Sequence, residues 1–233
     1  MILSTGCWPG VSSLMAKALL AAQFNDTDPS EVSCKFQFYT AGSGNAGVTL
    51  LVATFLILAE KALKIKNGVK TFVQPMDAYE RIDFGERVGE KFCAPLNLLE
   101  TASVAETLKI GSVEAIFGTA PTFWNSLLGF SAKFPPSLLS HESLMRSLST
   151  FSMPIVRFVD KFAGAVNAMR VDLTDQKTTV SATYAHIDLE PCVGECVAAF
   201  AAAILTEEVR LDGERRTAEN NRLYKQNTAN PHN

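Results

Sequence analysis

The chain has 233 residues, of which 47% are hydrophobic and 15 are phenylalanine, so it is long and apolar enough to bury one sizeable core. Its 21 Lys and Arg residues are balanced by 24 Asp and Glu residues, which gives a net charge of −3. No run of basic residues gathers on any predicted face, so we expect no nucleic-acid partner.

Cysteine usage and hydropathy narrow the class of protein further. The chain has five cysteines, an odd number, and they are scattered through apolar stretches. This usage is typical of a reducing compartment, the cytoplasm or an organelle interior, and not of a secreted protein. The apolar stretches 48–59 and 197–205 are shorter than the roughly 20 residues of a membrane-spanning helix. We therefore expect buried helices there and no membrane partner.

The first third of the chain alternates between helical and extended patterns. Apolar residues at helical spacing predict a helix from Val11 to about Gln23. Alternating apolar and polar residues over 32–39 predict a strand with one buried face. After the loop Gly42 to Gly47, a continuously apolar run predicts a helix over 48–62. The extended stretch that follows has Asn67-Gly68 at its middle, which predicts a tight hairpin.

The middle of the chain has weaker patterns. Residues 82–85 have the character of a short strand or turn, 96–106 of a helix and 113–117 of a strand. Pro121 suits the first turn of the next helix, because its missing N–H needs no partner there.

The last third begins with a predicted helix for which Ser152 is the N-cap and Gly164 the terminator. Two strands over 165–173 and 178–187 then form a predicted antiparallel hairpin, followed by an alanine-rich helix over 193–205. Together these elements predict an α+β fold, with a mixed and largely antiparallel sheet covered by helices. The polar composition from residue 206 to 233 predicts a disordered tail.

The loop from Gly42 to Gly47 is the one segment that matches a cofactor-binding motif. Gly42-Ser43-Gly44-Asn45-Ala46-Gly47 has the GxGxxG spacing of a dinucleotide-binding loop and lies between a predicted strand and a predicted helix. Such a loop also needs a second, parallel strand that ends in an acidic residue about 20 positions on. The sequence offers Lys64, Lys66 and the hairpin in that region. We therefore expect a tight turn that lets the helix pack closely on the strand, with cofactor binding as the alternative.

The chain offers few candidates for catalysis. It has three histidines, and no nucleophile triad can be assembled around them. His186 shares a predicted strand face with Val180, Ala182 and Tyr184. It is therefore either a partly buried, hydrogen-bonded histidine, which we favour, or a polar group that faces a substrate cleft.

Cys192 and Cys196 are the second candidate, because residues four apart share one face of a helix. Their spacing is not C-x-x-C, and neither a histidine nor a second cysteine pair accompanies them in the sequence. We therefore expect the packing of small side chains and no metal site.

Four segments, taken in order, resemble the saccharopine dehydrogenase-like oxidoreductases, a family with an N-terminal NAD(P)-binding Rossmann domain and a C-terminal mixed α+β domain. The first carries a G-x-x-P-G turn, and the second a strand and glycine loop that belong to the family's second domain. The resemblance covers roughly residues 1–205. The segments are Thr5-Gly6-Cys7-Trp8-Pro9-Gly10-Val11-Ser12, Phe38-Tyr39-Thr40-Ala41-Gly42-Ser43-Gly44-Asn45-Ala46-Gly47, Phe117-Gly118-Thr119-Ala120-Pro121 with Phe123-Trp124-Asn125, and Val193-Gly194 with Ala198-Ala199-Phe200.

The resemblance implies a division of the chain. Residues 1–10 would be the end of the last Rossmann strand and the interdomain turn, 11–205 the substrate-binding and dimerisation domain, and 206–233 a tail. The NAD(P)-binding domain itself would be missing, so we expect this chain alone to bind no cofactor and to be inactive. NAD or NADP would be bound by the complete protein. The expected partners are a second copy or a full-length relative, together with a small-molecule substrate.

The resemblance also implies where the substrate lies. The G-x-x-P-G turn borders the interdomain cleft in the family, which makes Trp8, Pro9 and Gly10 substrate-side candidates, with Tyr39 and His186 added from the neighbouring strands. Two alternatives stay open: a non-catalytic interaction or dimerisation module, and a self-contained small dehydrogenase that uses the loop from Gly42 to Gly47.

Overall fold

The computed structural model describes residues 6–42 and 47–206, apart from the side chains of 160, 162 and 163. The described helices are α1 (Val11–Gln23), α2 (Val48–Leu58), α3 (Leu99–Leu108), α4 (Thr122–Ser131), α5 (Pro136–Leu139), α6 (Glu142–Ala163) and α7 (Leu189–Leu205), with a 3-10 turn at Pro29–Glu31. The described strands are β1 (Ser33–Ala41), β2 (Ala62–Lys66), β3 (Val69–Val73), β4 (Glu80–Asp83), β5 (Glu90–Pro95), β6 (Ser112–Ala120), β7 (Val166–Thr174) and β8 (Thr179–His186).

The strands form a mixed, mostly antiparallel sheet of eight strands in the order β3-β2-β6-β1-β7-β8, with β5 pairing with β6 and β4 with β5. Within the described residues, β1 and β6 are the one parallel pair. The fold is α+β, as the sequence predicts. Because β1, β6 and β8 run in the same direction, their carboxyl ends lie at the same edge of the sheet.

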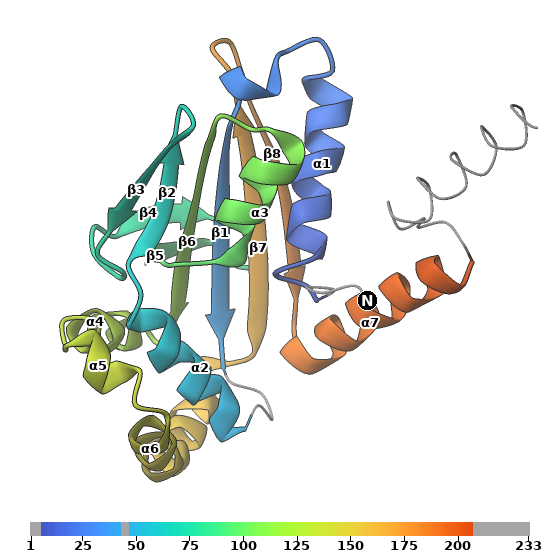
Figure 1. The fold of residues 1–233 in the computed structure, drawn as a ribbon. Coiled ribbons are helices and arrows are strands. Elements are labelled where there is room, and N and C mark those ends of the chain that lie inside the picture. The colour runs from blue at the N-terminus through green and yellow to red at the C-terminus, as the bar shows by residue number, and fades with distance from the viewer. Residues whose placement is uncertain (1–5, 43–46, 207–233) are drawn as a thin grey trace, which may run out of the picture.

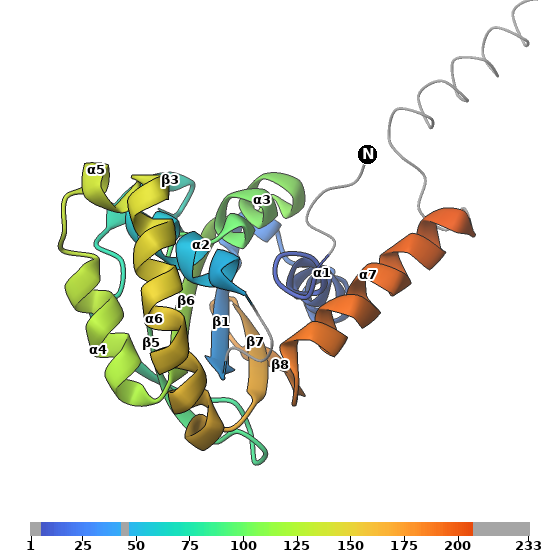
Figure 2. The ribbon, with the colours of Figure 1, turned by 90° about the horizontal axis from the view of Figure 1, so that it is seen from below.

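The two faces of the sheet are covered differently (Figure 1). On the first face, alternate residues such as Phe36, Phe38 and Met169 are fully buried beneath α1 and α3. On the second face, Tyr39 packs against Phe84, which follows β4. A third apolar cluster joins α2, α4, α5 and α6 beside the sheet, while α7 extends away on the other side (Figure 2).

Several predicted elements are confirmed. α1 has the predicted bounds, and Gly164 ends α6 with a φ of 73°. The hairpin of β2 and β3 turns at Asn67 and Gly68, whose φ angles of 49° and 76° are both positive, as this tight turn requires. The strands β7 and β8 form the predicted antiparallel hairpin.

The predicted start of the long helix at Ser152 is wrong. α6 begins at Glu142, after His141 as its N-cap, and it continues through Pro154. Proline removes one helical hydrogen bond. The helix tolerates this loss because its inner face, including Met145 and Met153, is buried, and the helix packs against α2.

Smaller differences concern the ends of helices and two short elements. α2 ends at Leu58, four residues before its predicted end, and α7 begins at Leu189, four residues before its predicted start. β5 and α5 were not predicted. No helix among the described residues is both long enough and apolar enough to cross a membrane.

Candidate functional site

A row of four polar residues crosses the first face of the sheet near the shared carboxyl edge. The strand register pairs Thr40 with Thr119 on one side and with Asn167 on the other, and it pairs Asn167 with His186. Each of these residues lies two positions from an apolar residue on the same face of its strand. The apolar residues are Phe38, Phe117, Met169 and Tyr184, all of which belong to the cluster beneath α1 and α3 or pack against it.

Hydrogen bonds hold three members of this polar row in place. The Thr40 hydroxyl donates to Oδ1 of Asn167 over 2.5 Å, and Asn167 is only 2% exposed. Nδ1 of the half-buried His186 lies 2.7 Å from the carbonyl oxygen of Asp188. When Nδ1 carries the proton, it donates to that carbonyl and Nε2 is an acceptor; when it does not, Nδ1 accepts from the backbone N–H of Asp188, 3.2 Å away. The polar row therefore offers hydroxyl, amide and imidazole groups at one edge.

Helix starts gather at the same edge. α2, α4 and α7 each follow the carboxyl end of a strand, and their N-caps are Gly47, Pro121 and Asp188. None of these three N-caps makes a side-chain capping bond. Uncapped N–H groups and the helix dipole favour negatively charged ligands.

The turn Gly6–Gly10 before α1 packs against the same face of the sheet. Gly6 N donates to the Pro9 carbonyl over 3.0 Å, and Gly10 has a φ of 142°, a conformation that favours glycine. The ring of Trp8 lies 5.4 Å from that of Phe38, which is the apolar residue beside Thr40. The structure therefore brings Trp8 and His186 to the same face of the sheet.

Tyr39 is not part of this arrangement. It is 5% exposed and points to the second face of the sheet, against Phe84 and beneath the ammonium group of Lys91. Burial raises the pKa of its hydroxyl. Of the sequence candidates, the turn residues and His186 lie on the first face, and Tyr39 lies on the other.

A group of three thiols lies beside Tyr184 of β8. Cys7 from the turn meets Cys192 and Cys196 from α7, and their sulfur atoms all lie within 4.8 Å of one another. The sulfurs of Cys7 and Cys192 are 3.3 Å apart. Burial is the main cause that raises the pKa of Cys7 and of Cys196, and the neighbouring Cys192 raises both further. The sequence pairs Cys192 with Cys196 through their helical spacing, but it gives no sign that Cys7 lies beside them.

The GxGxxG segment lies largely outside the described residues, which include its first and last glycines, Gly42 and Gly47. After α2 the chain enters β2, which pairs antiparallel with β6 and is not a neighbour of β1. The strand, loop and helix are therefore not continued by the adjacent parallel strand that a Rossmann unit requires.

Sequence reasoning missed Thr40, Thr119 and Asn167. The sequence contains a signal for them, because each is a single polar residue at the end of an otherwise apolar strand face. Recognising that these positions form one row requires the strand order, which local patterns do not supply. No family model matches this chain, and no curated protein matches it either.

Proposed function

We propose that this chain is the substrate-binding and dimerisation part of an NAD(P)-dependent oxidoreductase of the saccharopine dehydrogenase-like type. The observation that carries the proposal is the polar row Thr119, Thr40, Asn167 and His186 at the shared carboxyl edge of the strands. In sheets that contain parallel strands, ligands commonly bind outside the carboxyl ends.

The chemistry of this edge suits an amino-acid-derived substrate. The uncapped starts of α2 and α4 carry no acidic residue and favour a carboxylate, whereas Asp188 and Glu190 already place negative charge at the start of α7. The polar row supplies donors and acceptors for the amino or keto group, and the ring of Trp8 offers an apolar surface for the carbon chain. Two of the segments that resemble the family border this row, since Trp8 of the Gly6–Gly10 turn contacts Phe38 and Thr119 of β6 pairs with Thr40.

The reaction we propose is transfer of a hydride between nicotinamide and the carbon of a carbon–nitrogen bond. A bound NAD(P)+, held by a separate Rossmann domain, supplies the hydride acceptor. Oxidation of the amine to an imine also releases a proton from nitrogen, and we assign His186 as its acceptor, through Nε2 in the tautomer whose Nδ1 donates to Asp188. The other residues of the row orient the substrate.

The five unlinked cysteines of the described chain support a reducing compartment.

The test is calorimetric titration of the chain with a panel of α-amino and α-keto acids, including glutamate, lysine and 2-oxoglutarate. We expect one acid to bind saturably and Thr40→Val to weaken binding about three- to tenfold, the effect of one lost hydrogen bond. Thr174→Val is the matched control, because Thr174 lies at the opposite end of β7. Equal losses in both variants, or no saturable ligand in the panel, would overturn the proposal.

A second candidate, a non-catalytic interaction module, is favoured by one exposed surface. On α6, Leu144, Leu148, Phe151 and Ile155 alternate at spacings of four and three residues, and all are between 43% and 78% exposed. This spacing is typical of a helix that packs against another helix. The stripe borders a pocket of about 240 Å³ lined mainly by apolar residues of α2, α4, α5 and α6.

Sedimentation velocity tests whether this stripe binds a second copy of the chain. Phe151→Glu should weaken self-association at least tenfold, because it places a charge in an apolar contact. Phe72→Glu on the edge strand β3 is the control, since Phe72 is also exposed and lies on a different surface. If Phe72→Glu alone disrupts the dimer, the contact is through the sheet edge; if the parent chain is monomeric at all concentrations, self-association is refuted.

A further inference from the structure

We propose that Cys7, Cys192 and Cys196 bind one zinc ion, which fastens α7 to the turn before α1. The three residues come from two segments that are far apart in the sequence, and all three side chains are buried. Cys192 and Cys196 face the same way because they are one helical turn apart. None of its ligands belongs to the polar row, although Cys7 precedes Trp8 and the other two thiols lie in the first turns of α7.

The geometry of the sulfurs matches a thiolate site. Zinc bound at about 2.3 Å from each sulfur in a tetrahedron separates the sulfurs by about 3.8 Å. The sulfurs of Cys7 and Cys192 are 3.3 Å apart, and no two of the three sulfurs are more than 4.8 Å apart. Side-chain shifts of a few tenths of an ångström to about 1 Å would bring all three sulfurs to a common ion. A disulfide needs about 2.05 Å and would leave one of the three thiols unused.

The grouping of three thiols distinguishes this site from the other two buried cysteines. The other two cysteines, Cys34 and Cys93, are also buried, but neither belongs to a group of metal-ligating side chains among the described residues. Each fills its place as a single small apolar residue would. The group at α7 instead concentrates soft ligands of the type that zinc prefers in a reducing compartment.

Zinc binds cysteine as the thiolate, so the ion displaces the thiol protons. Binding therefore releases protons and weakens as the pH falls. Three thiolates leave one tetrahedral position for water or another ligand. The hydroxyl of Tyr184 lies 3.9 Å from the sulfur of Cys192.

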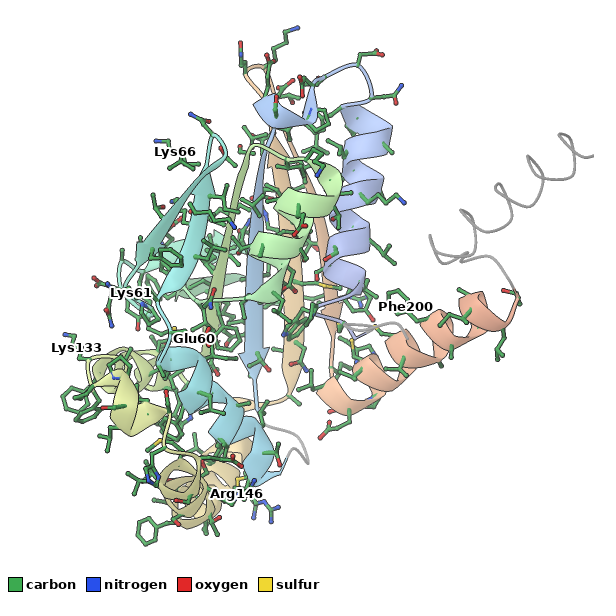
Figure 3. The ribbon with its side chains drawn as sticks, viewed as in Figure 1. Glu60, Lys61, Lys66, Lys133, Arg146 and Phe200 are labelled. Carbon is green, nitrogen blue, oxygen red and sulfur yellow. The ribbon has the colours of Figure 1, made fainter. Side chains whose placement is uncertain are left out.

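The arrangement of α7 explains what such an ion would stabilise. Cys192 and Cys196 are the buried residues of this helix, and beyond them α7 extends away from the sheet. Phe200, labelled in Figure 3, lies on this extended part, and Val197 and Leu205 are 46% and 84% exposed. The attachment of α7 to the body thus depends on the residues that carry the thiols.

The test is titration of the intact chain, reduced with a phosphine and freed of metal, with Co²⁺ as a spectroscopic substitute for zinc. We expect thiolate-to-cobalt absorption that saturates at one equivalent and disappears when Zn²⁺ is added. Thermal unfolding should shift to a higher temperature with one equivalent of Zn²⁺. Absence of a saturable band in the parent chain overturns the proposal without any variant.

Variants identify the ligands. Cys7→Ala, Cys192→Ala and Cys196→Ala should each lose the one-equivalent band, while Cys34→Ala and Cys93→Ala should keep it. Circular dichroism establishes that each variant is folded. A band that survives in Cys7→Ala, or that all five variants lose alike, refutes this site. Thiol counting without reductant that finds a disulfide between Cys7 and Cys192, with no zinc bound, refutes it as well.

Discussion

Glu100 is a buried carboxyl group whose ionisation affects stability. It is 1% exposed, and its Oε1 accepts a hydrogen bond of 2.9 Å from Ser12. Burial raises the pKa of its carboxyl group, more strongly than the Ser12 hydrogen bond lowers it. The folded state therefore binds the proton more tightly than the unfolded state, and folding loses free energy as the pH rises above the ordinary glutamate pKa.

Glu100→Gln should remove this loss, since the amide oxygen can still accept from Ser12 and no charge is buried. We expect a higher free energy of unfolding than that of the parent chain at pH 7, and a difference that vanishes below the ordinary pKa of glutamate, where both states are protonated. Urea unfolding at the two pH values measures this. A variant that is less stable than the parent at pH 7 would contradict the assignment.

Gly118 shows how closely two backbones approach within the sheet. A Cβ at this position would lie 2.1 Å from the carbonyl oxygen of Phe92 on β5. Gly118→Ala should therefore lower the free energy of unfolding by about 1–3 kcal/mol. Gly194→Ala in α7 meets nothing within 4 Å and should raise it by about 0.5–1 kcal/mol. Chemical denaturation of both variants distinguishes crowding from a general effect of alanine.

At the residue scale, the sequence alone identifies some residues of the candidate site and misses others. His186 and Trp8 stand out because histidine and tryptophan are rare in this chain. Thr40 and Asn167 each end an otherwise apolar strand face, but only the register shows that they lie side by side. Cys7 joins the other two thiols through tertiary packing, which no local spacing encodes.

At the scale of elements, the hairpin of β2 and β3 offers a clean test of turn chemistry. Gly68 has a φ of 76°, and a Cβ there meets no atom within 4 Å, so any effect of substitution is conformational. Gly68→Ala should lower the free energy of unfolding by about 1 kcal/mol. Gly68→Asn should cost less, because asparagine tolerates this conformation. Equal losses in the two variants would contradict the turn assignment.

The elements that the sequence missed have physical reasons. The first half of α6 is rich in serine and threonine, which have poor helix propensity. Ser147, Thr150 and Ser152 donate instead to the carbonyl four residues earlier, so their hydroxyls are satisfied within the helix. β5 is short, and it is held by its pairing with β4 and β6 rather than by a pattern of its own.

At the scale of the whole molecule, the α+β class and most elements follow from periodicity and turn residues. The strand order does not, because it depends on pairings such as that of β1 with β6, which are about 80 residues apart in the sequence. That order creates the shared carboxyl edge on which the proposed function depends. It also leaves exposed apolar surfaces on α6 and α7, which we expect to contact other copies or domains.

In our proposal, this chain binds the substrate and a separate domain binds the nicotinamide cofactor. The most direct measurement is a fluorescence titration of the chain with NADH and NADPH, because a real binding site changes nicotinamide emission. We predict no saturable change with either nucleotide, while the acid identified by calorimetry binds. Saturable binding at micromolar concentration would place the cofactor on this chain and contradict the account.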